Sequence, residues 1–265
     1  MRLHRNRFSL GLLAAMTLPF LLQAAPTPPK QTSPTATTVP LGDPRSLELN
    51  EQGIAAIKAR NLKQAEELFR KAISADAKNI TAVFNLAGVL MANKKEKEAI
   101  DLLTHYLKDY PEDPGMWVRL GDAWFASKNI KEAAKAYEKA AATFPNYPGL
   151  AAKLGTIYGL QNKIDLAEKM FLQAVAEDPK NHQLLANLAS IFLGNGKPDK
   201  AISTAKRALA IKATSEVYIT LGTAYEIQKD YKNALIAFQR AADLGDKREE
   251  LKKKIAALKE SVPKE

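Results

Sequence analysis

The chain has 265 residues, of which 46% are hydrophobic and 26% charged, with a formal net charge of +10 at pH 7. It contains no cysteine, so disulfide bonds are excluded and stability must come from packing alone. Its basic residues are not interleaved with aromatic residues in a cluster, and we therefore expect no nucleic-acid partner.

The first 24 residues have the features of a secretory signal peptide. Three arginines precede an apolar run over residues 8–22, and two alanines follow it. We expect cleavage after Ala24, which would yield a periplasmic or secreted protein with a net charge of +7, because three basic residues and no acidic ones are removed. The alternative is an uncleaved segment that anchors the protein, although the run is short for a membrane span and contains Pro19.

Residues 25–45 are rich in proline and threonine and show no apolar periodicity. This composition predicts a disordered, extended tether between the signal peptide and the rest of the chain.

From residue 46 onward, one pattern recurs about every 34 residues. In its third copy, Trp117, Leu120, Gly121 and Trp124 have the spacing of one face of a helix. The small residue of this pattern recurs at Gly53, Ala87, Gly121, Gly155, Ala189 and Gly222. A second set of small residues is expected where a following helix crosses the first, at Ala65, Ala99, Ala133, Ala167, Ala201 and Ala234. Each copy thus predicts two amphipathic helices in close contact, and prolines follow the second helix in three copies, at Pro111, Pro145 and Pro179.

This pattern resembles the tetratricopeptide repeat (TPR), a helix–turn–helix unit with the same period. The resemblance implies an all-α solenoid, a right-handed superhelix of stacked repeats that holds other polypeptides. Six repeats are predicted, at residues 46–79, 80–113, 114–147, 148–181, 182–214 and 215–248. Residues 249–265 carry an apolar stripe of Leu251, Ile255 and Leu258, which predicts a helix that caps the last repeat.

The fifth repeat departs from the pattern in three ways. Ala205 stands where an aromatic residue is usual, the turn at 194–198 contains two glycines and a proline, and one residue is missing before the next repeat. We therefore expect the junction at 205–215 to be less stable than the junction at 140–150.

No catalytic, cofactor-binding or metal-binding motif is visible in the sequence, so we expect a protein that is not an enzyme. Two histidines follow the predicted signal peptide, His105 and His182. Neither has a partner at the spacing of a metal site or a catalytic triad.

The family resemblance also implies where a partner binds. In TPR proteins the first helices line the concave face, and the sixth residue of each repeat points toward it; here these residues are Glu51, Asn85, Arg119, Lys153, Asn187 and Thr220. Asparagine amides suit a peptide backbone, and Arg119 and Lys153 would form a positive centre. With neighbouring ninth residues added, the expected groove site consists of exposed polar residues: Asn85, Arg119, Asp122, Lys153, Thr156, Asn187 and Ser190. The alternative is that Asn85 and Asn187 only hydrogen-bond across helices.

Two functions remain open after these steps. The first is a scaffold or adaptor in a bacterial cell envelope that binds a peptide or protein in its concave groove. The second is an assembly factor of a membrane machine, such as a pilus, a polysaccharide exporter or a cytochrome maturation complex. In the second case the convex face and the tether would make the contacts.

Overall fold

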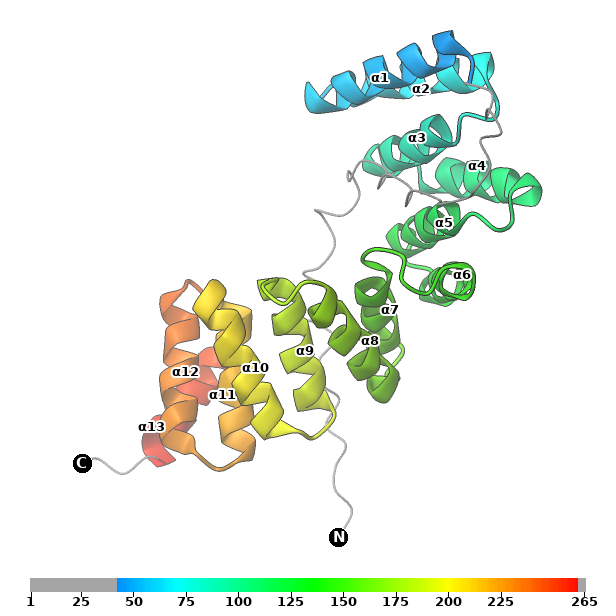
Figure 1. Cartoon of the computed structure of the whole chain (residues 1–265). Coiled ribbons are helices and arrows are strands. Elements are labelled where there is room, and N and C mark those ends of the chain that lie inside the picture. Colours follow the sequence, from blue (N-terminus) through cyan, green and yellow to red (C-terminus); the bar gives the residue numbers. More distant parts are fainter. Residues whose placement is uncertain (1–41, 262–265) are drawn as a thin grey trace. The chain divides into compact units, whose positions relative to one another are not determined.

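The computed structural model describes residues 42–261, and all regular structure in this range is helical (Figure 1). The predicted signal peptide and residues 25–41 of the predicted tether lie outside the described residues. The helices of the described part are α1 (Pro44–Lys58), α2 (Leu62–Ala75), α3 (Ile80–Ala92), α4 (Glu96–Asp109), α5 (Pro114–Ala126), α6 (Ile130–Thr143), α7 (Leu150–Leu160), α8 (Ile164–Glu177), α9 (His182–Gly194), α10 (Pro198–Ile211), α11 (Ser215–Ile227), α12 (Tyr231–Asp243) and α13 (Glu249–Ser261).

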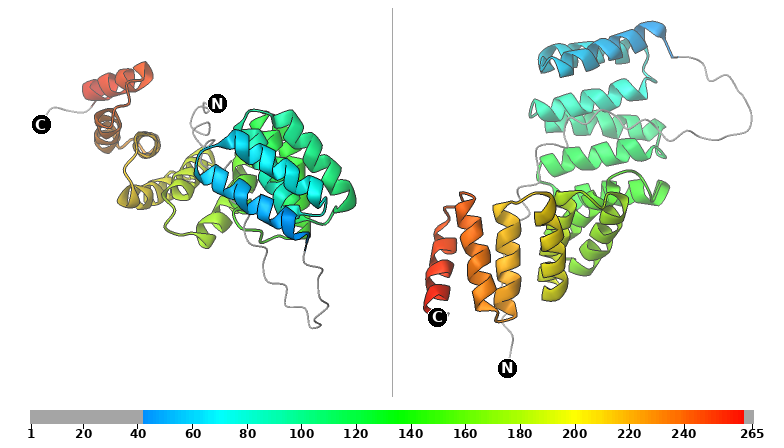
Figure 2. Two further views of the ribbon diagram at one scale, coloured as in Figure 1. Left: turned by 90° about the horizontal axis from the view of Figure 1, so that it is seen from above. Right: turned by 60° about the vertical axis from the view of Figure 1, so that its left-hand side comes forward.

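The helices form two compact blocks, which are described separately. Within the described residues, the N-terminal block comprises 42–150 and the C-terminal block comprises 151–261. The first twelve helices form pairs, and a turn of three residues joins the two helices of each pair. Figure 2 shows paired helices side by side within each block. The prediction of an all-α repeat fold is confirmed.

The start of α1 corrects the predicted end of the tether. The Asp43 carboxylate caps the helix by accepting hydrogen bonds from the backbone N–H groups of Arg45 and Ser46. Pro44 occupies the first helical position, where its missing N–H has no partner to lose. The sequence from Pro44 onward is therefore helical, and the tether predicted over 25–45 extends two residues too far.

Within each helix pair, a small residue of the first helix lies against the second helix. In four repeats this residue is a glycine that lies under an aromatic ring, in the pairs Gly53–Phe69, Gly121–Tyr137, Gly155–Phe171 and Gly222–Phe238. A Cβ added at Gly121 would lie 2.4 Å from the Tyr137 ring, closer than carbon atoms approach each other.

In repeats two and five, different residues occupy the contact between the two helices. Their small residues are Ala87 and Ala189, and Leu103 and Ala205 replace the aromatic ring on the second helix. All four residues are fully buried. Both repeats thus combine an added methyl group on the first helix with a smaller side chain on the second, and whether Ala205 weakens repeat five stays a prediction.

The turn within each repeat requires a left-handed backbone at its middle residue. The φ angle there is 61° at Arg60, 60° at Lys94, 64° at Lys128, 58° at Asn162, 67° at Gly196 and 62° at Lys229. Of these six residues only glycine lacks the Cβ that makes this conformation costly. The glycine of the turn at 194–198 therefore suits its backbone and is no reason to expect weakness there, and the stability of repeat five stays a prediction.

The boundary between the two blocks also bears on the expected weak junction. The boundary between the two blocks falls at residues 150 and 151, and the junction at 205–215 lies inside the C-terminal block. The breaker-rich turn is thus a weaker reason to expect instability, and the comparison of 205–215 with 140–150 stays a prediction.

A half-buried carboxylate joins repeats one and two. Glu66 on α2 accepts hydrogen bonds from Asn93 Nδ2 at 3.0 Å and from Lys95 Nζ at 2.8 Å, both in the turn of repeat two. Arg70 Nη2 donates to the same carboxylate at 2.9 Å. Burial alone would raise the pKa of Glu66, but these hydrogen bonds outweigh it and lower the pKa from 4.5 to about 2.

The same arrangement recurs between repeats four and five. Glu168 on α8 accepts hydrogen bonds from Asn195 Nδ2 and, at 2.8 Å, from Lys197 Nζ, both in the turn of repeat five. Burial opposes the shift here too, yet the hydrogen bonds and the charge of Lys197 lower the pKa of Glu168. We call these two clusters the carboxylate latches, because each fastens a turn to the preceding repeat.

The last helix covers the end of the C-terminal block. Leu251 and Leu258 of α13 are buried against a cluster that includes Phe238 of α12, and Ile255 packs against it. This is the apolar stripe from which the capping helix was predicted. Of the helices in residues 42–261, none is both long and apolar enough to cross a membrane.

Candidate functional site

In the N-terminal block, the predicted groove residue Asn85 is engaged inside the protein. It lies on α3, is only 6% exposed, and its Nδ2 donates to Asn50 Oδ1 on α1 at 3.1 Å. A similar bond links Asn79 Nδ2 to Ser46 Oγ at 2.8 Å. For Asn85 the structure thus shows the alternative stated above, a hydrogen bond across helices.

Arg119 and Asp122 on α5 are also buried. Arg119 is 3% exposed, and its guanidinium carbon lies 3.6 Å from the centre of the Phe84 ring. Asp122 accepts a hydrogen bond of 2.7 Å from the Tyr137 hydroxyl. Burial lowers the pKa of Arg119, while the neighbouring Asp122 charge acts in the opposite direction. The expectation that Arg119 is an exposed groove residue is wrong, because the aromatic ring of the preceding repeat covers it.

Lys153 and Thr156 belong to α7 in the C-terminal block. Both are half-buried, and the Thr156 hydroxyl donates to the backbone carbonyl of Ala152 at 2.9 Å. Neither residue lines the cleft described next.

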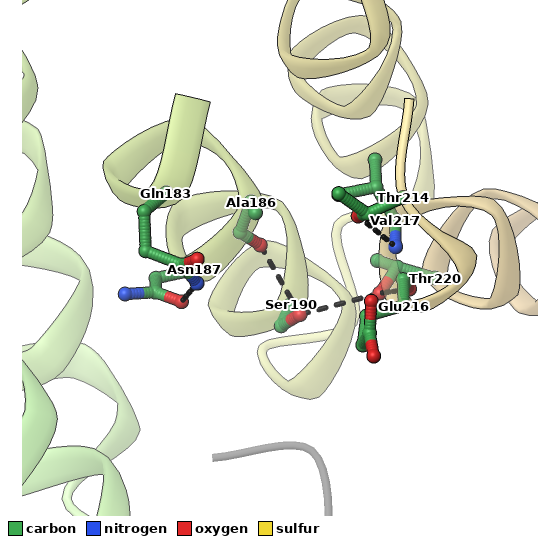
Figure 3. Close-up of a pocket in the computed structure, with 8 residues that line it drawn as sticks. All are labelled: Gln183, Ala186, Asn187, Ser190, Thr214, Glu216, Val217 and Thr220. Atoms are coloured by element: carbon green, nitrogen blue, oxygen red, sulfur yellow. Dashed lines mark hydrogen bonds between the residues drawn. The ribbon is translucent and has the colours of Figure 1, made fainter. Parts of the chain in front are cut away.

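The C-terminal block contains a small cleft between the first helices of repeats five and six (Figure 3). Its volume is about 140 Å³. The lining residues come from α9, from α11 and from the loop before α11: Gln183, Ala186, Asn187, Ser190, Thr214, Glu216, Val217 and Thr220. Two predicted groove residues, Asn187 and Ser190, are brought together here.

Hydrogen bonds within the lining hold these side chains in place. Gln183 Nε2 donates to Asn187 Oδ1 at 3.1 Å, one helical turn away. The hydroxyls of Ser190 and Thr220 lie 3.3 Å apart and connect α9 with α11. Thr214 caps α11 by accepting a hydrogen bond from the backbone N–H of Val217. The polar lining is thus preorganised by its own contacts.

Sequence reasoning missed part of this lining. Thr220 holds the sixth position of repeat six, so the repeat pattern identified it as inward-facing. Gln183 could have been found because it precedes Asn187 by four residues, which places both on one helix face. Glu216 could have been found in the same way, because it precedes Thr220 by four residues and holds the second position of repeat six, as Gln183 does in repeat five.

Residues 42–261 contain no group of three histidine, cysteine or acidic side chains that could hold a metal ion. His182 stands at the start of α9, where burial and then the charge of Lys212 lower its pKa. His105 is exposed on α4.

Comparison with known proteins supports the repeat assignment. Family models described as tetratricopeptide repeat match residues 56–120, 98–148, 153–216 and 215–244. None of the curated proteins compared with the chain matches it.

Several solved structures share the fold. PilF of Pseudomonas aeruginosa is 14% identical, with a TM-score of 0.69 over 82% of this chain and 98% of that one. PilW, a widely conserved type IV pilus biogenesis factor, is 18% identical, with a TM-score of 0.67 over 80% and 98%. YrrB, a TPR protein with an unusual peptide-binding site, is 19% identical, with a TM-score of 0.65 over 73% and 99%.

These similarities agree with the helix pairs and with the recurring small residues described above. The family models together cover more than half of the sequence. The chain belongs to the tetratricopeptide repeat family.

Proposed function

We propose that the protein is a non-enzymatic interaction scaffold of the bacterial cell envelope, and that it holds an extended segment of a partner polypeptide in the cleft between α9 and α11. The observation that carries this proposal is the polar, preorganised lining of the cleft. Small-molecule sites usually measure about 300–1,000 Å³. A volume of about 140 Å³ suits one side chain or a short length of peptide instead.

Two further points support the proposal. The described peptide-binding site of YrrB shows that a similar solenoid can bind peptides. The signal peptide predicted over residues 1–24 supports export. Protein sequencing of the mature N-terminus would test that part, since an N-terminus at Met1 would contradict cleavage and favour an anchored protein.

Peptide selection tests the cleft directly. A phage-displayed library of random dodecapeptides would be selected on the full mature chain and on its Ala186→Trp variant, which fills the cleft from α9. Ser203→Trp places the same ring on the exposed face of α10 and serves as the control. We expect peptides that bind the wild type and the control but not Ala186→Trp. If all three proteins select the same peptides, or none does, the cleft is not the binding site.

A second function, assembly factor of a membrane machine, is favoured by a different observation. The second helices of the C-terminal block expose large apolar side chains, among them Leu166, Leu172 and Ile236. PilF and PilW resemble this chain over nearly their whole length. Replacing Leu166 and Ile236 by serine should then release an envelope complex that Ala186→Trp leaves intact, as measured by co-purification from membranes.

A further inference from the structure

Hydrogen bonds within the cleft occupy the hydrogens of two hydroxyl groups, those of Ser190 and Thr220. Ser190 Oγ lies 3.2 Å from the Ala186 carbonyl, and Thr220 Oγ1 donates to the Glu216 carbonyl at 3.1 Å. Each hydroxyl has one hydrogen, and these bonds together with the mutual Ser190–Thr220 contact use both. What these two groups still offer a ligand is lone pairs.

A negative charge lies at the rim of the same cleft. Glu216 is an exposed cleft residue at the start of α11 (Figure 3). Arg248, in the loop before α13, donates hydrogen bonds of 3.0 Å from Nε to both carboxylate oxygens of Asp246, and these bonds, with a contribution from the charge of Glu216, raise the pKa of Arg248. Lys212 is exposed in the loop between α10 and α11, and its charge contributes, after burial, to lowering the pKa of His182 at the start of α9. Glu216 is therefore the charged side chain of the cleft lining itself.

We propose that the cleft selects a partner segment carrying a basic side chain, lysine or arginine, which enters between α9 and α11. The ammonium or guanidinium group would donate to the hydroxyl oxygen of Ser190 and pair with the Glu216 carboxylate, while Thr220, only 2% exposed, holds Ser190 in place. A group with several donors and no acceptor matches a carboxylate beside a hydroxyl whose hydrogen is already used. This inference rests on the proposed function, since it names the residue class recognised at that same cleft.

The test uses the dodecapeptides selected as described above on the full mature chain. For each peptide, a partner version replaces every lysine and arginine by glutamine. Affinities are measured by calorimetry or fluorescence anisotropy for the wild type, for Glu216→Gln and for Glu67→Gln. Glu67 is exposed on α2 in the other block, so its substitution makes the same change in net charge away from the cleft.

We expect the selected peptides to be enriched in lysine and arginine. Glu216→Gln should weaken their binding by about three- to tenfold, with less effect at high salt, and Glu67→Gln should leave it unchanged. The glutamine versions should bind wild type and Glu216→Gln alike. Circular dichroism of both variants shows whether the fold is intact.

Two other outcomes are separable. If peptides bind the wild type and fail to bind Ala186→Trp but lack basic residues, or if Glu216→Gln binds basic peptides as well as the wild type does, the charge recognition is wrong while the peptide-binding function stands. If no peptide depends on the open cleft, the proposed function fails, and the selection of basic side chains fails with it.

Discussion

The contact between glycine and aromatic ring makes a quantitative prediction for Gly121→Ala and Gly155→Ala. The new Cβ would lie 2.4 Å from the Tyr137 ring in the first case and 2.9 Å from the Phe171 ring in the second. Both rings are buried, so neither can swing into solvent. To reach an ordinary van der Waals distance from the new Cβ, the Tyr137 ring must shift by roughly 1 Å in Gly121→Ala. The Phe171 ring must shift by only about half as much in Gly155→Ala.

Two opposing effects determine how much stability each substitution loses. Alanine favours a helix over glycine by about 0.5–1 kcal/mol. Overpacking a core costs about 1–3 kcal/mol, and a displaced Tyr137 would also lose its hydrogen bond to Asp122, which contributes about 1 kcal/mol or more. We therefore expect Gly155→Ala to lower the free energy of unfolding by about 1 kcal/mol and Gly121→Ala by about 2–3 kcal/mol. The larger Gly121→Leu and Gly155→Leu changes should cost at least as much.

Urea unfolding followed by circular dichroism would measure these values, with a double-mutant cycle as the decisive comparison. Repeat two pairs an alanine with Leu103, so Phe171→Leu should accommodate the new methyl group of Gly155→Ala. The double variant should be more stable than the sum of the two single changes predicts, by about 1 kcal/mol. Additive effects, or a Gly121→Ala protein as stable as the wild type, would refute the packing argument.

Three further predictions concern charge and backbone. The pKa of Glu66 is lowered from 4.5 to about 2, so the latch around it should add about 1–3 kcal/mol to the free energy of unfolding above pH 4.5. This contribution should be lost as the pH falls toward 2. In unfolding curves measured across this pH range, Glu66→Gln should remove the acid-dependent part. Gly196→Ala should lower the melting temperature, at a cost of about 1 kcal/mol, whereas Lys128→Gly should not lower it, because both positions are left-handed. Arg119→Ala should destabilise the N-terminal block by about 1–3 kcal/mol, and Lys153→Ala should change stability by less than about 1 kcal/mol.

Each of these has a contrary result. An acid transition unchanged by Glu66→Gln would show that other groups set the pH dependence. A Gly196→Ala protein that melts with the wild type would contradict a cost for the left-handed backbone. Equal losses from Arg119→Ala and Lys153→Ala would contradict the difference in burial between the two residues.

The sequence was sufficient for the helices because their signals are local and repeated. The six alanines predicted at helix crossings, Ala65 to Ala234, are all fully buried. The prolines at 111, 145 and 179 each follow the end of a helix by two residues. Small residues and helix breakers act within one repeat, and their recurrence in successive repeats makes the period visible in the sequence.

The site was harder to predict because it depends on contacts between repeats. Arg119 has the sequence position of a groove residue, yet it is buried, with the Phe84 ring of the preceding repeat packed against its guanidinium. Asn85 likewise donates a hydrogen bond to Asn50 of the preceding repeat. Asn187 and Ser190 were predicted and lie in a cleft, yet whether they bind a partner stays a prediction. A side chain's repeat position indicates its direction but not what the next repeat places over it.

The carboxylate latches show that this chain repeats on a second, longer scale. Glu66, Asn93 and Lys95 have counterparts 102 residues later at Glu168, Asn195 and Lys197, and repeats two and five also share the alanine in place of glycine. At this level the building unit is a trio of repeats, and the six repeats are not equivalent modules. A chimera that exchanges repeat one for repeat four would keep each glutamate opposite its asparagine and lysine. An exchange of repeat one for repeat three, which has Ala134 at the glutamate position, would leave that asparagine and lysine facing a methyl group.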